Sequence, residues 1–449
     1  GELSLNIPIY TYRDDDFTIP VSLSYSYNGL KVNQQAGYVG LGWTLNFGGY
    51  ITRQVRGIPD EERSSMTISQ DGYASVDLYG YNYNSYYPVS QFEAQPLYGE
   101  FTPGKILNIF YHNSTSGKRY EVTSDIYHFN FLGHSGTFVN DRNTGKYNVY
   151  HTSSFDKDYT IVYDYNTESY EGNSYVVISG YDIKTSDGYT YHFGSCDPLV
   201  QPSISRKPYD ATERDITIDK NKSDSPIPGT ITAWALRRIT APNGRYVEFL
   251  YENDVKASDE PSSAINYNSS LWYYSDNEPN SIIHYTESYH SYLLPYAIVV
   301  DGTTKISFSY TEKQTGEIPW YRNGIYRPRP IGEQYTYPLL TGISDHMSNT
   351  TLSYTFNSQG SPYPFLASVD IDSVGRYSFS YKGLDDGYFP LLGTSAKDHW
   401  GYLNKTEKDA CDSNYVAPSQ LFQNNGLTET LTSFRNPNFD ASSLGLMTS

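Results

Sequence analysis

Two groups of aspartates are the residues with the clearest potential for chemistry. Asp14, Asp15 and Asp16 are consecutive in "RDDDF". Asp370 and Asp372 alternate in "DIDSVG", so both of their side chains project from one side of an extended chain. Carboxylate oxygens suit Ca²⁺, and either group could hold this ion, although neither has the spacing of an EF-hand loop. Aspartates in turns also accept backbone hydrogen bonds. We expect this structural role and no cofactor, with Ca²⁺ as the alternative.

The sequence contains none of the common catalytic motifs. It has no G-x-S-x-G, no phosphate-binding loop and no H-E-x-x-H, and its nine histidines are scattered without metal-ligand spacing. A glycoside hydrolase needs two facing carboxylates, and nothing selects such a pair among 50 acidic residues. We assign no catalytic, cofactor-binding or metal-binding residue and expect that the protein is not an enzyme. A glycan-active hydrolase is the second alternative.

Aromatic side chains suggest a further function class. The chain has 48 tyrosines, and tyrosine-rich polar surfaces are a general means of recognition. Five aromatics in two short runs could stack on sugars: Trp272, Tyr273, Tyr274, Trp320 and Tyr321. Most of the others fall at inward positions of alternating segments, where core packing explains them. A cell-surface adhesin or carbohydrate-binding module is the first alternative, with a glycan or a cell-surface protein as its partner.

Charge and composition exclude several partners. The formal net charge of −18 argues against binding to nucleic acid or to an anionic membrane surface. No apolar run reaches the about 18 residues expected of a membrane-spanning segment. Cys196 and Cys411 are the only cysteines, too few for a zinc site made of cysteines or for a disulfide framework. Whether they pair with each other is left open.

Strict alternation of apolar and polar residues predicts strands along most of the chain. It is clearest in "PVSLSYSY" (20–27), "KISFSYTE" (305–312) and "RYSFSYKG" (376–383). Candidate helices are limited to "PDEERSSM" (59–66) and "SAINYNSSLWYY" (263–274). We therefore expect an all-β fold: a large curved antiparallel sheet assembled from successive hairpins, with few short helices.

A repeated frame supports the hairpin prediction. Each copy has an apolar start, a tight turn of the Asn-Gly kind and a strand that ends in an aromatic residue. In the first, second and fourth copies, the inner apolar residue precedes the final aromatic residue by 12 residues. In the third copy, Ile343 precedes Phe356 by 13 residues. The four copies are 236–251, 295–310, 340–356 and 366–381, and 181–193 is a looser fifth.

The polar, proline-rich segment 221–230 is the predicted internal boundary. It divides an irregular N-terminal β module (1–225) from the hairpin region (226–449). We expect "GYNYNSYYP" (80–88) to be a mobile surface loop, and the tail from about 411 to be loop-like.

The opening segment resembles a known family. It contains "IPI" at 7–9, "PVSLSY" at 20–25 and "GLGWTL" at 40–45, followed by "ITR" at 51–53. In this order the motifs are similar to the opening module of bacterial RHS/YD-repeat shell proteins, particularly toxin-complex B components and virulence-plasmid toxin relatives. The hairpin frame resembles a divergent YD repeat, and "KDHWGYLN" (397–404) resembles another segment of these proteins.

The resemblance implies a non-enzymatic scaffold. Such proteins are large, exported and bacterial, and their β-strips form a hollow shell or surface structure that can carry a C-terminal effector. Leu446 has the pattern of the start of another hairpin, so we expect the chain to be a fragment of a longer protein. Its first partner would then be the remainder of its own chain, at the cell surface or outside the cell.

The glycines around Trp43 have a structural interpretation. Val39, Leu41, Trp43 and Leu45 would share one face of a strand, which leaves a bare glycine face for an aromatic of a neighbouring strand to cover. A ligand on that face is the alternative. "NFGGY" is then a turn or bulge that redirects the chain. We expect Arg53 to be partly buried and paired with a carboxylate, rather than to bind an anion.

Overall fold

The computed structural model describes residues 3–31, 36–68, 74–83, 110–112, 119–121, 123–141, 146–152, 158–170, 173–194, 212–219, 230–252, 263–271, 283–291, 293–314, 320–322, 325–327, 336–345, 347–356, 363–372, 374–384, 402–403 and 446–448. Within these ranges the chain is almost entirely β-strand, which confirms the predicted all-β class. The one helical element there is a single 3₁₀ turn, η1 (Tyr81–Tyr83).

Neither predicted helix forms a helix where it is described. Residues 59–66 begin with a turn, closed by a hydrogen bond from the Glu62 amide to the Pro59 carbonyl, and continue as β5 (Arg63–Ile68). Residues 263–271 form β18 (Ser263–Leu271), and 272–274 lie outside the described residues. Local helix preference is weak in both segments, and pairing with a neighbouring strand overrides it.

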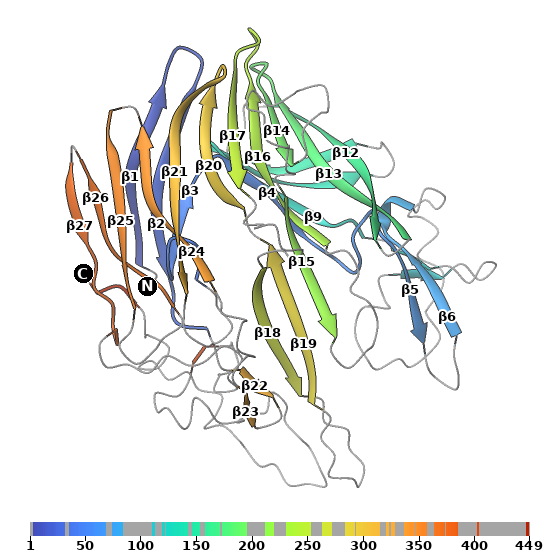
Figure 1. Ribbon diagram of the computed structural model, residues 1–449. Helices are drawn as coiled ribbons and strands as arrows, with labels where there is room; N and C mark the ends of the chain where they lie inside the picture. The colour runs from blue at the N-terminus through green and yellow to red at the C-terminus, as the bar shows by residue number, and fades with distance from the viewer. Residues whose placement is uncertain are drawn as a thin grey trace.

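The main ladder is antiparallel and is assembled hairpin by hairpin (Figure 1). It contains all four predicted hairpins and the looser fifth, which are β13–β14, β16–β17, β20–β21, β24–β25 and β26–β27. In order of hydrogen-bonded neighbours its strands are β12 (Tyr159–Tyr170), β13 (Asn173–Thr185), β14 (Thr190–Gly194), β16 (Thr230–Thr240), β17 (Tyr246–Glu252), β20 (Leu294–Val300), β21 (Thr303–Gln314), β24 (Thr336–Asp345), β25 (Asn349–Thr355), β26 (Phe365–Ile371) and β27 (Gly375–Ser378).

A second ladder branches from β16. Its residues 233–235 pair with β4, and its residues 238–240 pair with β17, so one long strand belongs to both ladders. The branch runs through β11 (Lys146–Thr152), β10 (His134–Asp141), β9 (Ile126–Phe131), β4 (Gly49–Gln54), β16, β15 (Thr212–Asp219), β19 (Ile283–Ser291) and β18. The predicted boundary at 221–230 lies outside the described residues except for Thr230.

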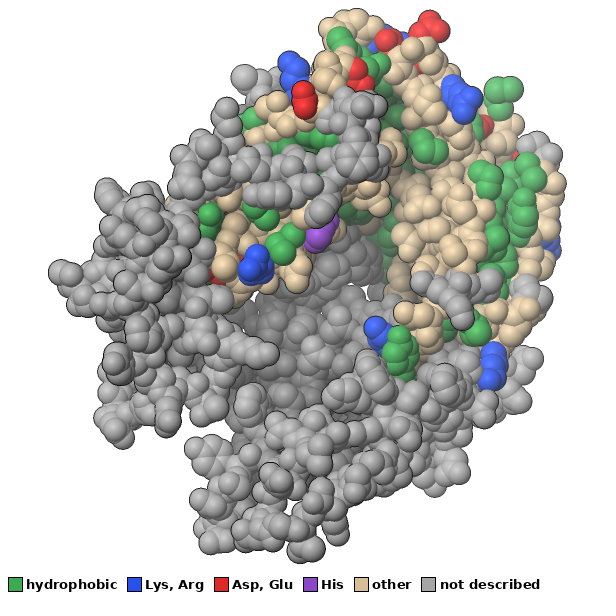
Figure 2. Space-filling model, turned by 180° about the vertical axis from the view of Figure 1, so that it is seen from behind, with side chains coloured by type: hydrophobic (Ala, Val, Ile, Leu, Met, Phe, Trp, Pro, Cys, Tyr) green, Lys and Arg blue, Asp and Glu red, His purple; other side chains and the backbone are tan. Residues whose placement is uncertain are grey.

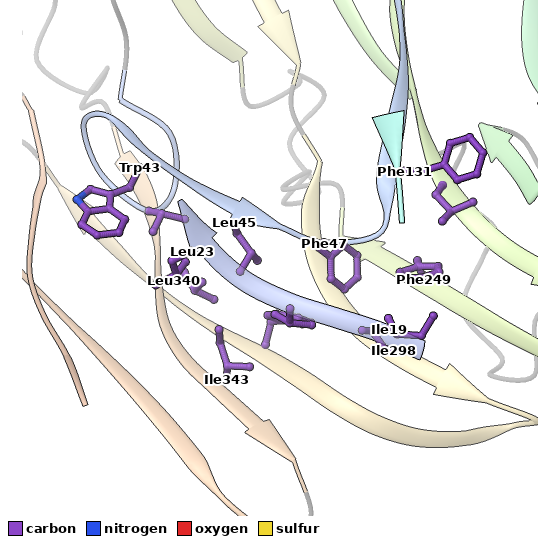
Figure 3. Close-up of a cluster of buried hydrophobic side chains, with 14 of the residues drawn as sticks. Ile19, Leu23, Trp43, Leu45, Phe47, Phe131, Phe249, Ile298, Leu340 and Ile343 are labelled. Atoms are coloured by element: carbon purple, nitrogen blue, oxygen red, sulfur yellow. The ribbon is translucent and has the colours of Figure 1, made fainter. Parts of the chain in front are cut away.

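A three-stranded sheet supplies the other side of the core. Its strands are β1 (Leu3–Arg13), β2 (Thr18–Tyr27) and β3 (Trp43–Asn46). The inward residues of β2 alternate with polar ones, and Figure 3 shows Ile19 and Leu23 facing Ile298, Leu340 and Ile343 of the main ladder. Tyrosine contributes to the interior as predicted, because several tyrosines are fully buried: Tyr25, Tyr127, Tyr181 and Tyr363.

Two small sheets complete the described fold. β5, β6 (Ala74–Tyr79), β8 (Arg119–Glu121) and β7 (Phe110–His112) form a four-stranded sheet, in which β6 and β8 are parallel. β22 (Trp320–Arg322) and β23 (Ile325–Arg327) form a two-stranded one. Of the predicted mobile loop at 80–88, Gly80 is buried and η1 follows it, and residues 84–88 lie outside the described residues.

Candidate functional site

The described hairpins are closed by a recurring side-chain hydrogen bond. A tyrosine in the second half of the hairpin donates its hydroxyl to the carbonyl of a first-strand residue that precedes it by 14 or 15 residues. The four bonds are Tyr251 to Leu236 (2.9 Å), Tyr310 to Pro295 (2.7 Å), Tyr354 to Leu340 (2.7 Å) and Tyr381 to Leu366 (2.6 Å). The predicted spacing frame therefore has a physical cause. In the third hairpin the closing residue is Tyr354 rather than the predicted Phe356.

Each of these carbonyls lies beside a β-bulge. In the pairing of each hairpin with the one before it, the register shifts at the residue that directly follows Leu236, Pro295, Leu340 and Leu366. A bulge disrupts the ladder and leaves a backbone group without its regular partner. The tyrosine hydroxyl supplies that partner, so one side chain both closes its hairpin and repairs the joint to the preceding hairpin.

The fifth hairpin uses a different donor at the same place. Phe193 occupies the closing position and has no hydroxyl. The carbonyl at the corresponding bulge belongs to Ile178, and it accepts a hydrogen bond of 2.9 Å from the indole nitrogen of Trp234. The donor therefore comes from β16, the next strand of the ladder. The joint is retained although its chemistry differs.

The glycines around Trp43 form turns rather than a bare strand face. Gly40 and Gly42 have φ values of 101° and 79°, which places them in tight turns, and the strand starts only at Trp43. A Cβ on Gly42 would lie 2.8 Å from the Tyr25 ring, so an aromatic of the neighbouring strand does cover this glycine, as predicted. The indole nitrogen of Trp43 donates to the hydroxyl of Tyr381 at 2.8 Å. This contact links the opening segment to the fourth hairpin.

The predicted turn at "NFGGY" is also confirmed. β3 ends at Asn46 in the three-stranded sheet, and β4 begins at Gly49 in the branch ladder. A Cβ on Gly49 would lie 2.4 Å from the Asn130 carbonyl oxygen, and only glycine permits this approach of β4 to β9. The aromatic neighbour of the turn is Phe47, which packs edge-on against Phe249 (Figure 3).

The consecutive aspartates bind a cation that belongs to the chain itself. Asp14 lies in the turn between β1 and β2, where its carboxylate accepts hydrogen bonds from the Asp16 and Phe17 amides. The Arg245 guanidinium contacts Asp14 and Asp16 at 2.7 Å each, and its Nε contacts Asp301 at 2.8 Å. Arg245 follows the β16–β17 turn, and Asp301 lies in the β20–β21 turn. We call these four residues the rim clasp.

The rim clasp contributes to the acidity of Asp14. Burial alone would raise the pKa of its carboxyl, but hydrogen bonds from the Phe17 amide, the Tyr12 hydroxyl and Arg245 lower this pKa to about 2. A fourth hairpin joins the clasp through Tyr189, whose hydroxyl donates to the Asp16 carbonyl at 2.9 Å. All four turns lie along the upper edge of the molecule in Figure 1, so the clasp fixes neighbouring hairpin tips.

Arg53 lies deeper than the sequence predicted and has two carboxylate partners. Its side chain is fully buried, its Nε contacts Asp125 at 2.7 Å, and its two Nη atoms contact Glu61 at 2.9 and 2.5 Å. Burial opposes the charge, but Glu61, Tyr127 and Asp125 outweigh it and raise the pKa of Arg53 well above its ordinary value. The guanidinium also lies over the rings of Tyr127 and Trp234. The predicted pairing is confirmed.

The other predicted groups form no site where they are described. Asp370 is exposed on β26, and Asp372 accepts the Asn349 amide at the adjacent turn. No cluster of three or more potential metal ligands occurs in the described ranges. The side chains of Trp320 and Tyr321 lie outside the described residues, as do Trp272 to Tyr274 and both cysteines. Within the described part of the chain, no helix is long and apolar enough to cross a membrane.

Charged side chains are sparse among the described residues on the face that Figure 2 shows. In Figure 2, acidic and basic side chains are scattered singly among uncharged ones, and several acidic side chains lie near the end of the molecule that carries the hairpin turns. Two groups of charged side chains do meet at joints between segments of the chain. They are the rim clasp and the cluster around Arg53.

Comparison with known proteins gave matches only among solved structures. No protein-family model matches the sequence, and no curated protein matches it. The chain is similar to the crystal structure of TcdB2-TccC3-Cdc42, at 11% identity and a TM-score of 0.32 over 85% of this chain and 16% of that one. It is also similar to the N-terminal domain of the effector protein SpvB from Salmonella typhimurium strain LT2, at 12% identity and a TM-score of 0.32, covering 84% of this chain and 99% of that domain.

The chain thus spans about a sixth of the TcdB2-TccC3-Cdc42 chain that it matches. The identities and TM-scores are too low to transfer any residue role. What the protein does is therefore argued from its own contacts.

Proposed function

We propose that the chain is a non-enzymatic structural scaffold, part of an exported RHS/YD-like protein whose hairpins form a shell or surface structure. The observation that carries the proposal is the repeated joint. A bulge, a carbonyl and a side-chain donor recur at each step of the main ladder from β12 to β27. A device repeated at every step serves the assembly of the sheet rather than one reaction centre.

The charged residues support the same interpretation. Arg53 and Arg245 are each held by carboxylates from distant segments, and neither guanidinium is directed at an open site. Bulges bend a strand and increase its twist, so a bulge at each hairpin gives the ladder a consistent curvature. A curved wall with fixed tips suits a protein that encloses or supports something else.

Residues 446–448 support a continuation of the ladder. Met447 pairs with Tyr381, just as Leu236, Pro295, Leu340 and Leu366 pair with the closing residue of the preceding hairpin. Met447 therefore occupies the register of a first strand, one residue later than the start predicted at Leu446. We propose that the remainder of a longer native chain adds its next hairpin at this edge.

The size of the native polypeptide tests this proposal. The chain has a mass of 50.9 kDa, and we expect the mature product in the producing cell to be several times larger and to be found outside the cytoplasm. A mature intracellular product of the chain's own mass would contradict the proposal. A glycan array is the second measurement, because saturable binding of one glycan class would favour the adhesin alternative.

A further inference from the structure

The four-stranded sheet β5–β6–β8–β7 is joined to the rest of the protein through a buried acidic neck. The chain leaves β4 through residues 55–62 to reach β5, and it returns from β8 through residues 122–125 to β9. The two crossings bring together Asp60, Glu61, Glu121 and Asp125, each at most 5% exposed, around Arg53. We call these five residues the neck.

Reciprocal hydrogen bonds tie the outgoing crossing to the returning one. The Asp60 carboxyl accepts the Asp125 amide at 2.9 Å, and the Asp125 carboxyl accepts the Asp60 amide at 3.1 Å. The Ser124 hydroxyl donates to Asp60 at 2.9 Å, and the Arg56 amide donates to Asp125 at 2.7 Å. Separation of the two crossings would break all four bonds.

The segment that follows β6 is bonded to the outgoing crossing at the same place. After β6 the Gly80 amide donates to the Glu62 carbonyl, and the Asn82 amide donates to the Asp60 carbonyl, both at 2.9 Å. A Cβ on Gly80 would lie 2.3 Å from the Pro59 carbonyl oxygen, so the backbones are in direct contact. Two passages of the chain between the small sheet and the ladders, and the segment that follows β6, are therefore held together at the neck.

Among the side chains that the structure describes, the neck holds more carboxyl groups than cations. Arg53 from β4 is bound to Glu61 and Asp125, and the groups that face the remaining acids are Glu62 from the outgoing crossing, Tyr127 from β9 and Tyr165 from β12. Neither tyrosine carries a positive charge. Four carboxylates around one guanidinium would leave uncompensated buried charge, which is strongly unfavourable.

Protonation resolves this excess of charge. Burial, together with the nearby Asp125 and Asp60, raises the pKa of Glu121 to about 9, and the smaller opposing effects of the Ile58 amide and Arg53 do not cancel this rise. Burial also raises the pKa of Asp60, with Asp125 adding to the rise. The pKa of Glu62, at the edge of the neck, is raised by burial and by Glu61. The closed neck therefore keeps protons that the same groups would release in water.

We propose that the neck is a proton-locked joint, which holds the four-stranded sheet against the ladders when it is protonated and releases that sheet when it loses its protons. We expect the main ladder to stay folded in both states. The inference concerns a movement within the chain and does not depend on the scaffold function.

The direction of the pH effect follows from the raised pKa values. Opening exposes Glu121 to water, where its pKa returns to about 4.5, so opening releases a proton at any pH between about 4.5 and 9. The closed joint is most stable below that range and loses stability as the pH rises through it. Each proton released makes the opening constant rise up to about tenfold per pH unit.

Hydrogen exchange of the full chain measures this opening. The exchange rates of the Asp60, Gly80, Asn82 and Asp125 amides, each divided by its intrinsic rate at that pH, give the opening constant of the neck. We expect this constant to rise about tenfold per pH unit between about pH 7 and 9. Amides of β17 and β20 in the main ladder should show no such rise. A constant that does not change with pH, or an equal rise in the ladder, would overturn the proposal.

Two variants assign the effect to the neck. Glu121→Gln removes the ionisation with little change of shape, and we expect the pH dependence of opening between about pH 7 and 9 to be lost. Asp60→Asn should weaken the dependence at lower pH, and it provides the test if the first variant does not fold. Asp370→Asn, at an exposed carboxylate of β26, is the control that should leave the dependence unchanged. Retention of the full dependence in both neck variants would refute the proposal.

Discussion

At the scale of single residues, Arg53 is the fully buried cation that joins three segments of the chain. It joins β4 to Glu61 in the outgoing crossing and to Asp125 in the returning crossing, inside a fully buried site. Removal of one partner from such a group leaves the other charges buried and unpaired, which costs far more than the pair contributes as a whole.

We therefore expect Arg53→Met to lower the free energy of unfolding by about 3–5 kcal/mol. Urea unfolding monitored by circular dichroism provides the measurement. Arg56→Met is a matched control, because Arg56 is exposed in the same segment and only its backbone amide takes part in the neck. A surface change of this kind should stay within about 0.5 kcal/mol. Equal losses in the two variants would contradict the role given to Arg53.

Gly42 provides a second test at this scale. Its φ of 79° favours glycine, and a Cβ would lie 2.8 Å from the Tyr25 ring. Gly244 has a similar φ of 87°, but nothing lies within 4 Å of its Cβ position. Gly244→Ala should therefore cost only the backbone strain, about 1 kcal/mol, and Gly42→Ala should cost clearly more. Thermal unfolding of both variants separates the backbone strain from the steric clash with Tyr25. Similar midpoints would show that the Tyr25 ring can move aside without a loss of stability.

At the scale of the strand and the hairpin, the closing tyrosines are the repeated unit. Tyr310→Phe keeps the ring and removes the hydroxyl that donates to the Pro295 carbonyl beside a bulge. We expect a loss of about 1 kcal/mol, together with faster hydrogen exchange at the β20–β21 hairpin. Tyr377→Phe is the control, since its side chain is 39% exposed. If the two substitutions have the same effect, the hydroxyl does not stabilise the joint.

The sequence predicts the hairpins well because their determinants are local. Alternation and Asn-Gly or Asp-Gly turns are read within about a dozen residues, and all five expected hairpins form. The tyrosine frame is visible as a spacing, but its acceptor is a carbonyl at a bulge in the pairing with another hairpin, which no local pattern contains. This is also why Phe356 was a natural but wrong choice for the closing residue of the third hairpin.

The charged joints could be predicted only in part, for the same reason. The pairing of Arg53 follows from its place between apolar residues of one strand face, but its partner Asp125 is 72 residues away. Glu61 belongs to a segment with a helix-like pattern, which pairing within the small sheet converts into a turn and a strand. The aspartates at 14–16 suggested a metal ion because their cation, Arg245, lies 231 residues from Asp14.

At the scale of the whole molecule, the described ladders behave as one wall because their ends are tied as well as their strands. The neck fixes the small sheet, Trp43 and Tyr381 join the opening segment to the fourth hairpin, and the rim clasp holds the hairpin tips. The clasp is the one of these ties that lies at the surface, so it is the easiest to remove without disturbing the core.

Arg245→Met tests how much the rim depends on that tie. Without the guanidinium, we expect the pKa of Asp14 to rise from about 2 toward its ordinary 3.8, which an NMR titration of the carboxyl would follow. A lowered pKa stabilises the fold above the ordinary value, and this contribution is lost as the pH falls through about 2 to 4. The variant should therefore be less sensitive to acid in that range than the unchanged protein, and amides of the β1–β2 and β20–β21 turns should exchange faster at neutral pH. Lys305→Met is the control. Lys305 lies over the ring of Tyr12, and none of the described contacts joins it to these aspartates. An unchanged Asp14 titration in Arg245→Met would mean that the turn's own amides, and not the clasp, set the acidity of the rim.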